Sequence, residues 1–555
     1  MKKVLALLLA MLLSVSVLSG CGSNEQTTDE QTTEQTQETE KTPTSSADNM
    51  VSNDCKGDVL TWNLGGDSEA LDPAWSVSSG SMSVVNNTFE GLMRNTGSGA
   101  QPAMAADMPQ EKVNEDGTVT LTYTLRDASW SDGEPVKAQD FEFAWKRCAN
   151  PENNASNAYL MSVLTGYDDI AQGLAEIDTL GVKAVDDKTL EVTLNQQTPY
   201  FNELLCLPAF MPLREDLVSS DSSWSKDPTR AVSNGPFTLV GYTEGVEFVL
   251  EKNKEYWNKD SISLDYIVAK MLDDNFAPVG MAFGDIVMTD GAISQPEDQT
   301  DTAGNTVEVP ELASTIEAST AASNRVVSLV VNANTGNELL KNADVRAALS
   351  KALDRTAAAQ AAGGEALTSV SGAQEILSAA ADDSGKSVIE AALADAGDSS
   401  TIEIVYLDNE QTAAALQTVK SAWEALGLTV NLTAQDAETF KLSRNSLQYS
   451  DVLCSVWEAD VNDQQLYLQP YLSSNLQSGC GYTNPDFDQL MLDAMQATGE
   501  ERTTKLNEAE KVLVDDAYVM PLYRNVITTT TDTAKVSGWT VDGNGMYWFG
   551  STTLA

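Results

Sequence analysis

Apolar and polar positions along the chain follow two different periods, and each period predicts one kind of element. Two-residue alternation or short apolar runs predict strands at 59–64, 118–125, 190–194, 326–331, 401–407 and 428–432. Apolar residues at helical spacing predict helices at 139–147, 345–355 and 412–426. The order strand, helix, Gly427 and strand over 401–432 is typical of a βαβ unit. Because no repeat period is present, the pattern predicts an α/β protein built from large lobes.

The first twenty residues carry a different pattern. Two lysines precede an uninterrupted run of apolar and small residues at 4–18. This run is shorter than the ~20 apolar residues that span a bilayer, so 1–20 is predicted to be a signal peptide. The sequence Leu-Ser-Gly-Cys at 18–21 is similar to the lipobox of bacterial lipoproteins, which implies that Cys21 carries a lipid after cleavage. A plain secretory signal followed by an incidental cysteine is the alternative.

The next stretch, 22–54, is rich in Glu, Gln, Thr and Ser, and it holds eight acidic residues and one basic residue, Lys41. Such a composition buries too little apolar surface to fold, and like charges keep the chain extended. We therefore expect 21–55 to comprise the lipidated cysteine and a disordered acidic tether that holds a folded body off the membrane. An interaction tail is the alternative.

Composition and charge narrow the possible functions. The 555 residues, of which 42% are apolar, are enough for two to four domains at roughly 100–200 residues each. With 33 basic and 82 acidic residues the net charge is −49, which argues against a nucleic-acid partner. The chain contains no histidine, so His-ligated zinc sites and Ser-His-Asp catalysis are excluded. No P-loop sequence occurs, so we expect no nucleotide hydrolysis and no cofactor.

The remaining cysteines do not predict a metal site. Cys55, Cys148, Cys206, Cys454 and Cys480 are odd in number and have no CxxC spacing. We expect buried free thiols, although one or two disulfides are compatible with an extracytoplasmic compartment.

A series of short motifs runs through the body of the chain in a fixed order. They are LDP at 71–73, FEGL at 89–92, LRDASWSDGEPV at 125–136, AQDF at 138–141, WKR at 145–147, PYF at 199–201, NGPF at 234–237, KN at 252–253, YW at 256–257, FGDI at 283–286, VRAAL at 345–349, ALDR at 352–355 and YTNPDFDQL at 482–490. The series resembles the oligopeptide- and dipeptide-binding proteins of bacterial ABC importers, the extracellular solute-binding proteins of family 5. For most motifs, including Trp130 with its Asp132-Gly133 turn and the 234–236 turn, a structural role is the expected one.

The resemblance implies an α/β, bilobed, periplasmic-binding-protein-like fold with two hinged lobes and an extra α/β domain. Lobe I would be discontinuous, over 56–89, 215–325 and 527–555. The extra domain would be inserted in lobe I at 90–214, and lobe II would span 326–526. The lobes would close on a peptide and present the closed form to the permease subunits of an ABC importer. The protein would be a monomer, not an enzyme, held by its lipid on the outer face of the cell membrane.

The candidate ligand site begins at Ser455-Val456-Trp457-Glu458-Ala459-Asp460, which resembles the family segment at the domain interface. The resemblance implies that this strand pairs with the main chain of a bound peptide and that Asp460 receives the peptide α-ammonium. A carboxylate there would offset the cost of taking the ammonium out of water. By their position after the LDP motif, Val77 and Ser79 would supply main-chain partners on the opposite lobe, and Tyr159 would cap the site near the amine; these three residues rest on spacing alone. A turn Asp and ordinary loop or core residues are the alternatives.

Three points remain open at this stage. Some relatives have Arg where this chain has Cys454, so the ligand carboxylate would meet Arg444, Lys441 or solvent. The Ala/Ser/Gly-rich stretch 363–398 departs from the family pattern and leaves part of one pocket wall undefined. An oligosaccharide ligand stacked on tryptophan, or a tethered carboxylate-pair hydrolase, are the rival functions, whereas nickel and haem are disfavoured without histidine.

Overall fold

The structure is a computed structural model that describes residues 51–66, 71–97, 99–218, 224–300, 306–396, 400–475 and 477–555. The predictions for the signal peptide, for Cys21 and for most of the tether lie outside the described residues. Within the described part of the chain, no helix is both long enough and apolar enough to cross a membrane.

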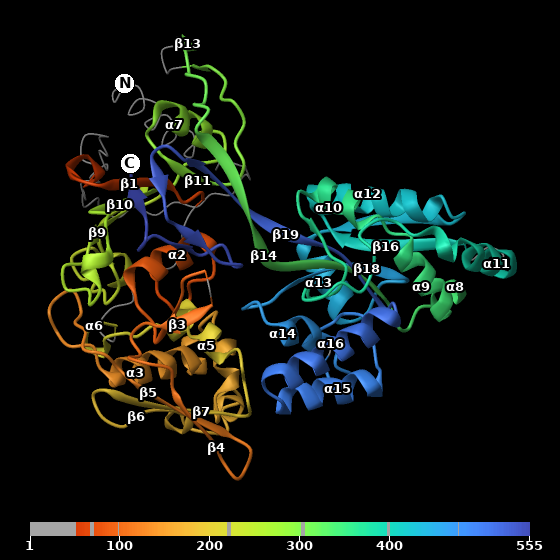
Figure 1. Ribbon diagram of the computed structural model, residues 1–555, viewed down its shortest axis with the longest axis horizontal. Helices are drawn as coiled ribbons and strands as arrows, with labels where there is room; N and C mark the ends of the chain where they lie inside the picture. Colours follow the sequence, from red (N-terminus) through yellow and green to blue (C-terminus); the bar gives the residue numbers. More distant parts are fainter. Residues whose placement is uncertain are drawn as a thin grey trace, which may run out of the picture.

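The chain forms two bodies that share one sheet (Figure 1). The order of its path is β17-β16-β18-β14-β19-β11-β1-β10-β9-β8, and β15 pairs with β19 beside this path. The left-hand body in Figure 1 contains β1 (Val59–Asn63), α2 (Ser79–Thr88), β8 (Phe237–Thr243), β9 (Glu247–Lys252), β10 (Tyr266–Lys270), α7 (Ala277–Phe283), β11 (Met288–Asp290), β12 (Gln299–Thr300), β13 (Thr306–Val307), β20 (Val536–Ser537), β21 (Thr540–Val541), β22 (Tyr547–Trp548) and β23 (Thr553–Leu554).

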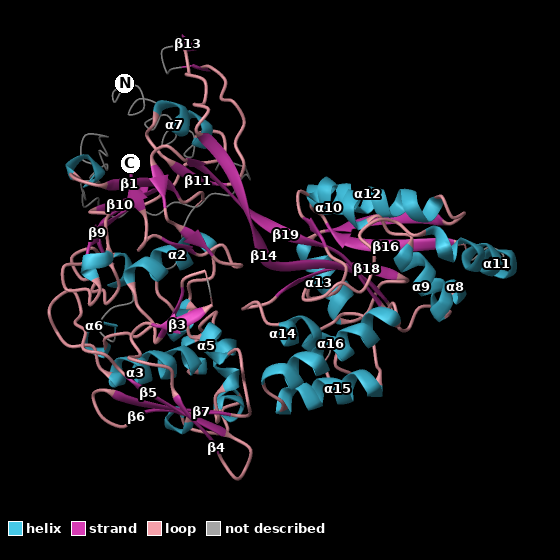
Figure 2. Cartoon of the chain, in the orientation of Figure 1, coloured by secondary structure: helices cyan, strands magenta, loops and turns pink. Residues whose placement is uncertain are grey.

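The right-hand body packs helices on both faces of its part of the sheet, with α10 and α12 above and α14 to α16 below in Figure 2. Its elements are α8 (Glu338–Lys341), α9 (Ala343–Lys351), α10 (Arg355–Ala362), β15 (Glu365–Ala366), α11 (Lys386–Ala396), β16 (Thr401–Leu407), α12 (Glu410–Glu424), β17 (Thr429–Gln435), α13 (Ala437–Asn445), β18 (Val452–Glu458), α14 (Gln464–Leu468), α15 (Pro485–Gln496) and α16 (Gly499–Asp515). Strands β16 and β17 are parallel and joined by α12, so the predicted βαβ unit is confirmed.

Two long antiparallel strands connect the bodies. β14 (Ile316–Val331) and β19 (Val519–Asp532) pair over most of their length, and the register shifts between Ala322 and Val326 and again at Val327. The first half of β14 is largely exposed, whereas its last residues are buried. Such irregularities bend a strand locally, and here they lie between the two bodies.

An additional antiparallel sheet, β4-β5-β7-β6, lies below the left-hand body in Figure 1. This part comprises β2 (Met93–Asn95), β3 (Ala100–Pro102), β4 (Gln110–Val113), β5 (Val119–Thr124), α3 (Ala138–Ala149), α4 (Tyr167–Ala171), β6 (Val182–Ala184), β7 (Thr189–Leu194), α5 (Phe201–Leu204) and α6 (Glu215–Val218). Its core includes Trp130, Phe141 and Trp145, all nearly inaccessible to solvent. The α/β fold with two bodies and an extra sheet follows the expectation, whereas the exact lobe boundaries stay predictions.

One predicted helix was wrong. The helical spacing at 345–355 predicted one helix, but α9 ends at Lys351 and α10 begins at Arg355. Asp354 lies in extended backbone, and its carboxylate accepts a hydrogen bond from the N–H of Ala357. An aspartate at this position begins a new helix by capping it, and the apolar periodicity gives no sign of the break.

Candidate functional site

Asp460 lies just beyond the end of β18, where three distant parts of the chain meet. Its side chain accepts a hydrogen bond from the phenol of Tyr159 at 2.5 Å, and its carbonyl oxygen accepts one from Nδ2 of Asn544 at 2.8 Å. Tyr159 belongs to the part of the chain that carries the additional sheet, and Asn544 belongs to the loop between β21 and β22. The structure therefore brings Tyr159, which was expected near the ligand amine, into contact with Asp460.

The local fold explains why the carboxylate faces the space between the bodies. The first four residues of β18 are buried, whereas Glu458 at its end is exposed. The N–H of Ala459 then bonds to the carbonyl of Asn324 on β14, which holds the chain as it leaves the strand. Burial raises the pKa of Asp460 above its ordinary value, and the negative charge of Glu458 adds to the effect. Such an acid is stabilised in its ionised form by any cation that reaches it.

Three adjoining cavities surround this point. The largest, of about 540 Å³, is lined by Tyr159, Trp457, Glu458 and Asp460 together with residues of 195–204 and 465–477. A second, of about 270 Å³, adds Val77, and a third, of about 460 Å³, adds Ser79 at the start of α2. Glu458 lines all three. The structure thus brings together six of the eight predicted residues around one cleft between the bodies.

The other two predicted residues, Ser455 and Val456, contribute no side chain to these cavities. They pair with Ser328 and Val327 of β14, and Ser455 is buried. On its other side β18 pairs with β16 only at Val452 and Leu453 among the residues that the structure describes. The main chain of 454–458 therefore presents an edge without a neighbouring strand, as a strand that accepts a peptide by β-addition requires.

Sequence reasoning missed one charged residue of the cleft, Arg325. Its guanidinium contacts the Glu458 carboxylate at 2.7 Å, and both side chains are about half exposed. Of the lysines and arginines in the described chain, it is the only one that lines any of these three cavities. Arg444 and Lys441, considered for the ligand carboxylate, do not line them: the guanidinium of Arg444 donates to the carbonyl of Gln477, and Lys441 is exposed on α13. No motif surrounds Arg325, so no sequence signal identified it.

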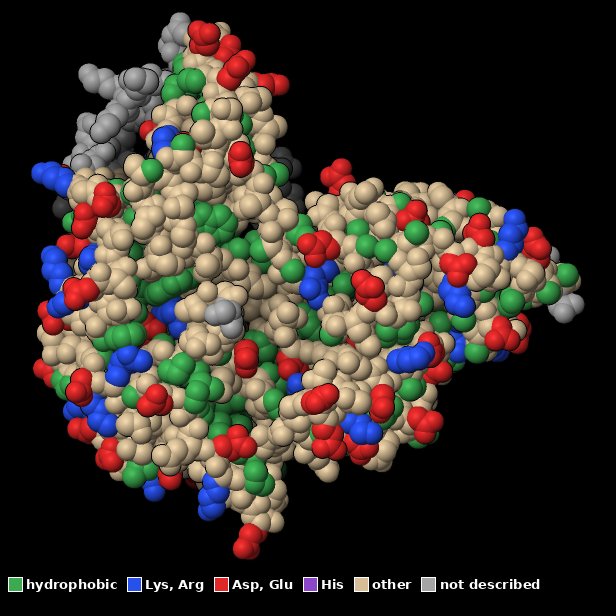
Figure 3. Space-filling view, viewed as in Figure 1, with side chains coloured by type: hydrophobic (Ala, Val, Ile, Leu, Met, Phe, Trp, Pro, Cys, Tyr) green, Lys and Arg blue, Asp and Glu red, His purple; other side chains and the backbone are tan. Residues whose placement is uncertain are grey.

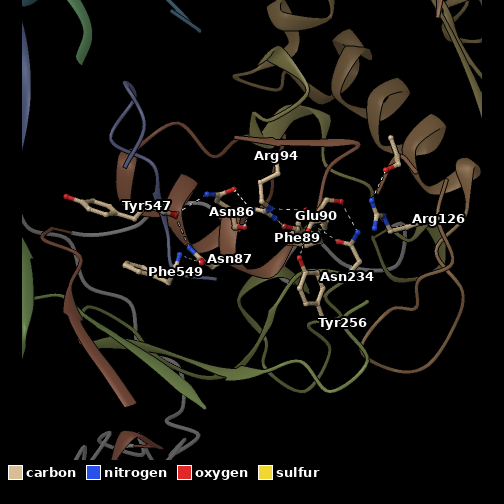
Figure 4. Close-up of polar contacts among 11 residues, drawn as sticks. Asn86, Asn87, Phe89, Glu90, Arg94, Arg126, Asn234, Tyr256, Tyr547 and Phe549 are labelled. Carbon is tan, nitrogen blue, oxygen red and sulfur yellow. Dashed lines mark hydrogen bonds and ion pairs between the residues drawn. The ribbon is translucent and has the colours of Figure 1, made fainter. Parts of the chain in front are cut away.

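The motifs at 89–92 and 234–237 have a structural role, as expected (Figure 4). Glu90, only 1% exposed, accepts hydrogen bonds from Nε of Arg94 at 2.8 Å and from the phenol of Tyr256 at 2.5 Å. The side chain of Asn234 bonds both the N–H and the carbonyl of Glu90. This buried network joins α2 to the 234–256 segment and supports the wall from which Val77 and Ser79 reach the cleft.

The Trp130 motif also belongs to the core, and four cysteines have the expected state. Trp130 is buried and donates from Nε1 to Asp140. Cys148, Cys206, Cys454 and Cys480 are buried free thiols, and burial raises the pKa of Cys148 and Cys454 to about 12. In the described ranges no group of three or more acidic, cysteine or histidine side chains is arranged to hold a metal ion.

The protein has two bodies connected by a pair of shared strands, and the cleft between the bodies contains an acid and an open strand edge. This arrangement defines a solute-binding protein of the bilobed type. The sequence profile of "Bacterial extracellular solute-binding proteins, family 5 Middle" matches residues 99–479. The chain belongs to this family, whose members are receptors for bacterial ABC peptide importers and not enzymes.

Individual relatives agree with this assignment. The chain is 28% identical to the oligopeptide-binding protein OppA of Bacillus subtilis, over 99% of both chains. It is 26% identical to the periplasmic oligopeptide-binding protein OppA of Escherichia coli, over 84% of this chain and 87% of that one. Among solved structures it resembles the unliganded open form of the murein tripeptide-binding protein MppA, with a TM-score of 0.74, 23% identity and coverage of 90% and 98%. Haemophilus influenzae OppA in complex with RPPGFSPFR gives a TM-score of 0.65 at 24% identity, over 90% and 99%. These likenesses confirm the fold.

Proposed function

We propose that this protein captures oligopeptides in the cleft between its two bodies and delivers them to the permease subunits of an ABC importer. The observation that carries the proposal is the position of Asp460, a partly buried acid in the cleft beside an open strand edge. A free peptide offers the matching groups, an ammonium for the acid and a main chain for the edge.

The ammonium would take a place close to the Asp460 carboxylate, with the Tyr159 phenol beside it. Main-chain hydrogen bonds along 454–458 would hold the rest of the ligand, because every peptide offers them whatever its side chains. Val77 and Ser79 lie across the cavities from β18 and would contact the ligand from the left-hand body. The cavities between leave room for side chains of different size, which favours broad specificity.

Capture would be coupled to movement about β14 and β19. These strands connect the bodies, and the irregular register between Ala322 and Ser328 lies in the connection. A ligand that contacts both bodies stabilises the closed form by the difference in its affinity for the two forms. The lobes at 56–89, 215–325 and 527–555 and at 326–526, with the insertion at 90–214, would be the moving units. A lipid on Cys21 would keep a monomeric receptor at the outer membrane face.

Ligand retention tests the proposal against its two rivals. The purified protein is incubated with a mixture of tryptic peptides and oligosaccharides, separated from unbound solutes, denatured and analysed by mass spectrometry. We expect intact peptides to be retained. Retention of oligosaccharides without peptides would show a sugar receptor, and cleavage of either class would show a hydrolase.

A further inference from the structure

A further cavity, of about 370 Å³, lies next to Asp460 on the side of the C-terminal loop. We infer that it is a binding pocket for a cationic side chain, lysine or arginine, of the bound peptide. The inference rests on the proposed function and adds to it a preference for peptides that carry lysine or arginine. The cavity lies between α5, the segment that follows Asp460, the β14 residues Ala322 and Asn324, and the loop between β21 and β22.

The charged residues that line this cavity are all acidic. Glu203 of α5 and Asp542 are its charged lining residues, and no lysine or arginine of the described chain lines it. Burial raises the pKa of the Cys206 thiol, which lines the same cavity; the positive charge of Arg94 lowers this pKa, and Glu203 and Asp542 raise it. Two acids in a partly desolvated space cost free energy as long as no cation accompanies them.

Neither acid forms an ion pair with a described residue, and the positive charge of Arg502, which acts on Glu203, is itself paired with Asp463. Oε2 of Glu203 is buried and has no hydrogen-bond partner among the described residues. Asp542 accepts hydrogen bonds from the N–H groups of Asn544 and Met546, which are neutral. Burial raises the pKa of Glu203 above its ordinary value and that of Asp542 to about 6. Both acids would therefore be stabilised by a cation brought in with a ligand.

The nearby arginines already have partners. Arg94 donates to Glu90, to the side chain of Asn86 and to the carbonyl of Phe89, and its guanidinium lies 3.6 Å from the ring centre of Trp548. Arg502 contacts Asp463 at 2.6 Å. A cationic group of a ligand would supply the positive charge that the lining of the cavity lacks.

The rest of the lining suits a group with several N–H donors. Five asparagines line the polar wall beside the two carboxylates: Asn86, Asn95, Asn324, Asn462 and Asn544. Four of their amide oxygens, all but that of Asn324, already accept one hydrogen bond within the protein and keep a second lone pair. Ammonium and guanidinium groups donate three to five hydrogen bonds and accept none, so a wall rich in acceptors matches them. A neutral or acidic side chain would leave the carboxylates without a counter-charge.

The cavity is joined to the ammonium site by shared residues. Asn544 lines it and also lines two of the cleft cavities, and its Nδ2 donates to the Asp460 carbonyl. Val461 and Asn462 follow Asp460 directly and line the cavity. If Asp460 holds the peptide amine, the cavity therefore receives a side chain close to the amino end of the peptide.

Calorimetric titration with designed tripeptides tests the inference. The ligands are Ala-Ala-Ala, Lys-Ala-Ala, Ala-Lys-Ala and Ala-Ala-Lys, with arginine and its neutral isostere citrulline in place of lysine in a second set. We expect the natural protein to bind at least one peptide with lysine or arginine near the amino end about tenfold more tightly than Ala-Ala-Ala, the gain of one charge-assisted hydrogen bond. Citrulline should not reproduce the gain.

Two variants locate the effect. In Glu203→Gln/Asp542→Asn the preference should disappear while the affinity for Ala-Ala-Ala is kept. Glu203→Gln alone, which alters an oxygen without a partner, should reduce the preference and guards against misfolding of the double variant. The control Glu338→Gln/Asp344→Asn removes two exposed charges from the right-hand body and should keep the preference.

The possible failures are distinguishable. Equal affinity of the natural protein for charged and neutral peptides would overturn the inference and leave the proposed function standing. A preference that survives in both pocket variants would also overturn it, because the cation would then bind elsewhere. If the natural protein bound no peptide at all, the proposed function would fall and this inference with it.

Discussion

Replacement of Asp460 by asparagine should separate the ammonium contact from all other contacts of a peptide. The amide side chain in D460N would keep the size of the original one and an oxygen that can accept the Tyr159 hydrogen bond, so the variant should fold normally. What it loses is the charge, and hydrogen bonds to a charged group contribute about 1.5–3 kcal/mol each. We therefore expect the dissociation constant of a free-amine peptide to rise about tenfold to a hundredfold in D460N.

The assay compares two ligands and two proteins by calorimetry. The tripeptide Ala-Ala-Ala and its N-acetyl form are titrated into the natural protein and into D460N. Acetylation removes the ammonium, so it should weaken binding to the natural protein by about the same factor as the D460N substitution does. In D460N, acetylation should have little further effect on the dissociation constant. When both modifications remove the same contact, their effects on the binding free energy do not add.

The matched control is Asp260→Asn, which removes an exposed carboxylate from the left-hand body. It should bind both ligands as the natural protein does. Unchanged affinity of D460N for the free-amine peptide would refute the ammonium contact at Asp460. Acetylation that weakens binding to D460N as much as binding to the natural protein would refute it as well.

Three further predictions concern stability and pH. Glu90→Gln should lower the free energy of unfolding in urea by about 3–5 kcal/mol, since it leaves a buried arginine unpaired. Loss of the exposed Lys254 ion pair in the control K254A should cost at most about 1 kcal/mol, and equal effects of the two substitutions would contradict the prediction. Gly235→Ala should destabilise by about 1–3 kcal/mol, because its Cβ would lie 2.6 Å from the backbone of a neighbouring segment, and Gly336→Ala, with open space around it, is the control that should change little. Affinity for free-amine peptides should fall as the pH is lowered from about 7 to 4, since Asp460 must be ionised to bind the ammonium. Because the pKa of Asp460 is raised, the affinity should be lost at a higher pH than with an ordinary aspartate. The same pH profile in D460N would contradict the assignment.

The sequence predicted the helices and strands that bury apolar residues in a regular pattern. It did not predict segments that are strands only because they pair with a distant strand. The strand at 326–331 was predicted from its buried residues, but β14 begins ten residues earlier, at Ile316. Its first half is exposed on most positions and has no apolar alternation. Pairing with β19 holds it extended, and such a long-range partner leaves no local signal.

The site shows the same division. Asp460 and Trp457 could be proposed because they belong to a segment with a recognisable family pattern, whereas Tyr159 was proposed from its spacing alone. Arg325 and Glu203 could not, since each acquires its place only through contacts between residues far apart in the chain. The net charge of −49 likewise predicts no patch: in Figure 3 acidic and basic side chains are scattered over both bodies. Which acids lack a counter-charge is visible only in the folded protein.

The central claim, that a peptide is held in the cleft with its amine at Asp460, is tested most directly by a crystal structure of the protein with Ala-Ala-Ala. We predict density for the peptide between the two bodies, with its amino-terminal nitrogen about 3 Å from the Asp460 carboxylate and its main chain along 454–458. Peptide bound at another surface, or bound in the cleft with its carboxylate end at Asp460, would contradict it.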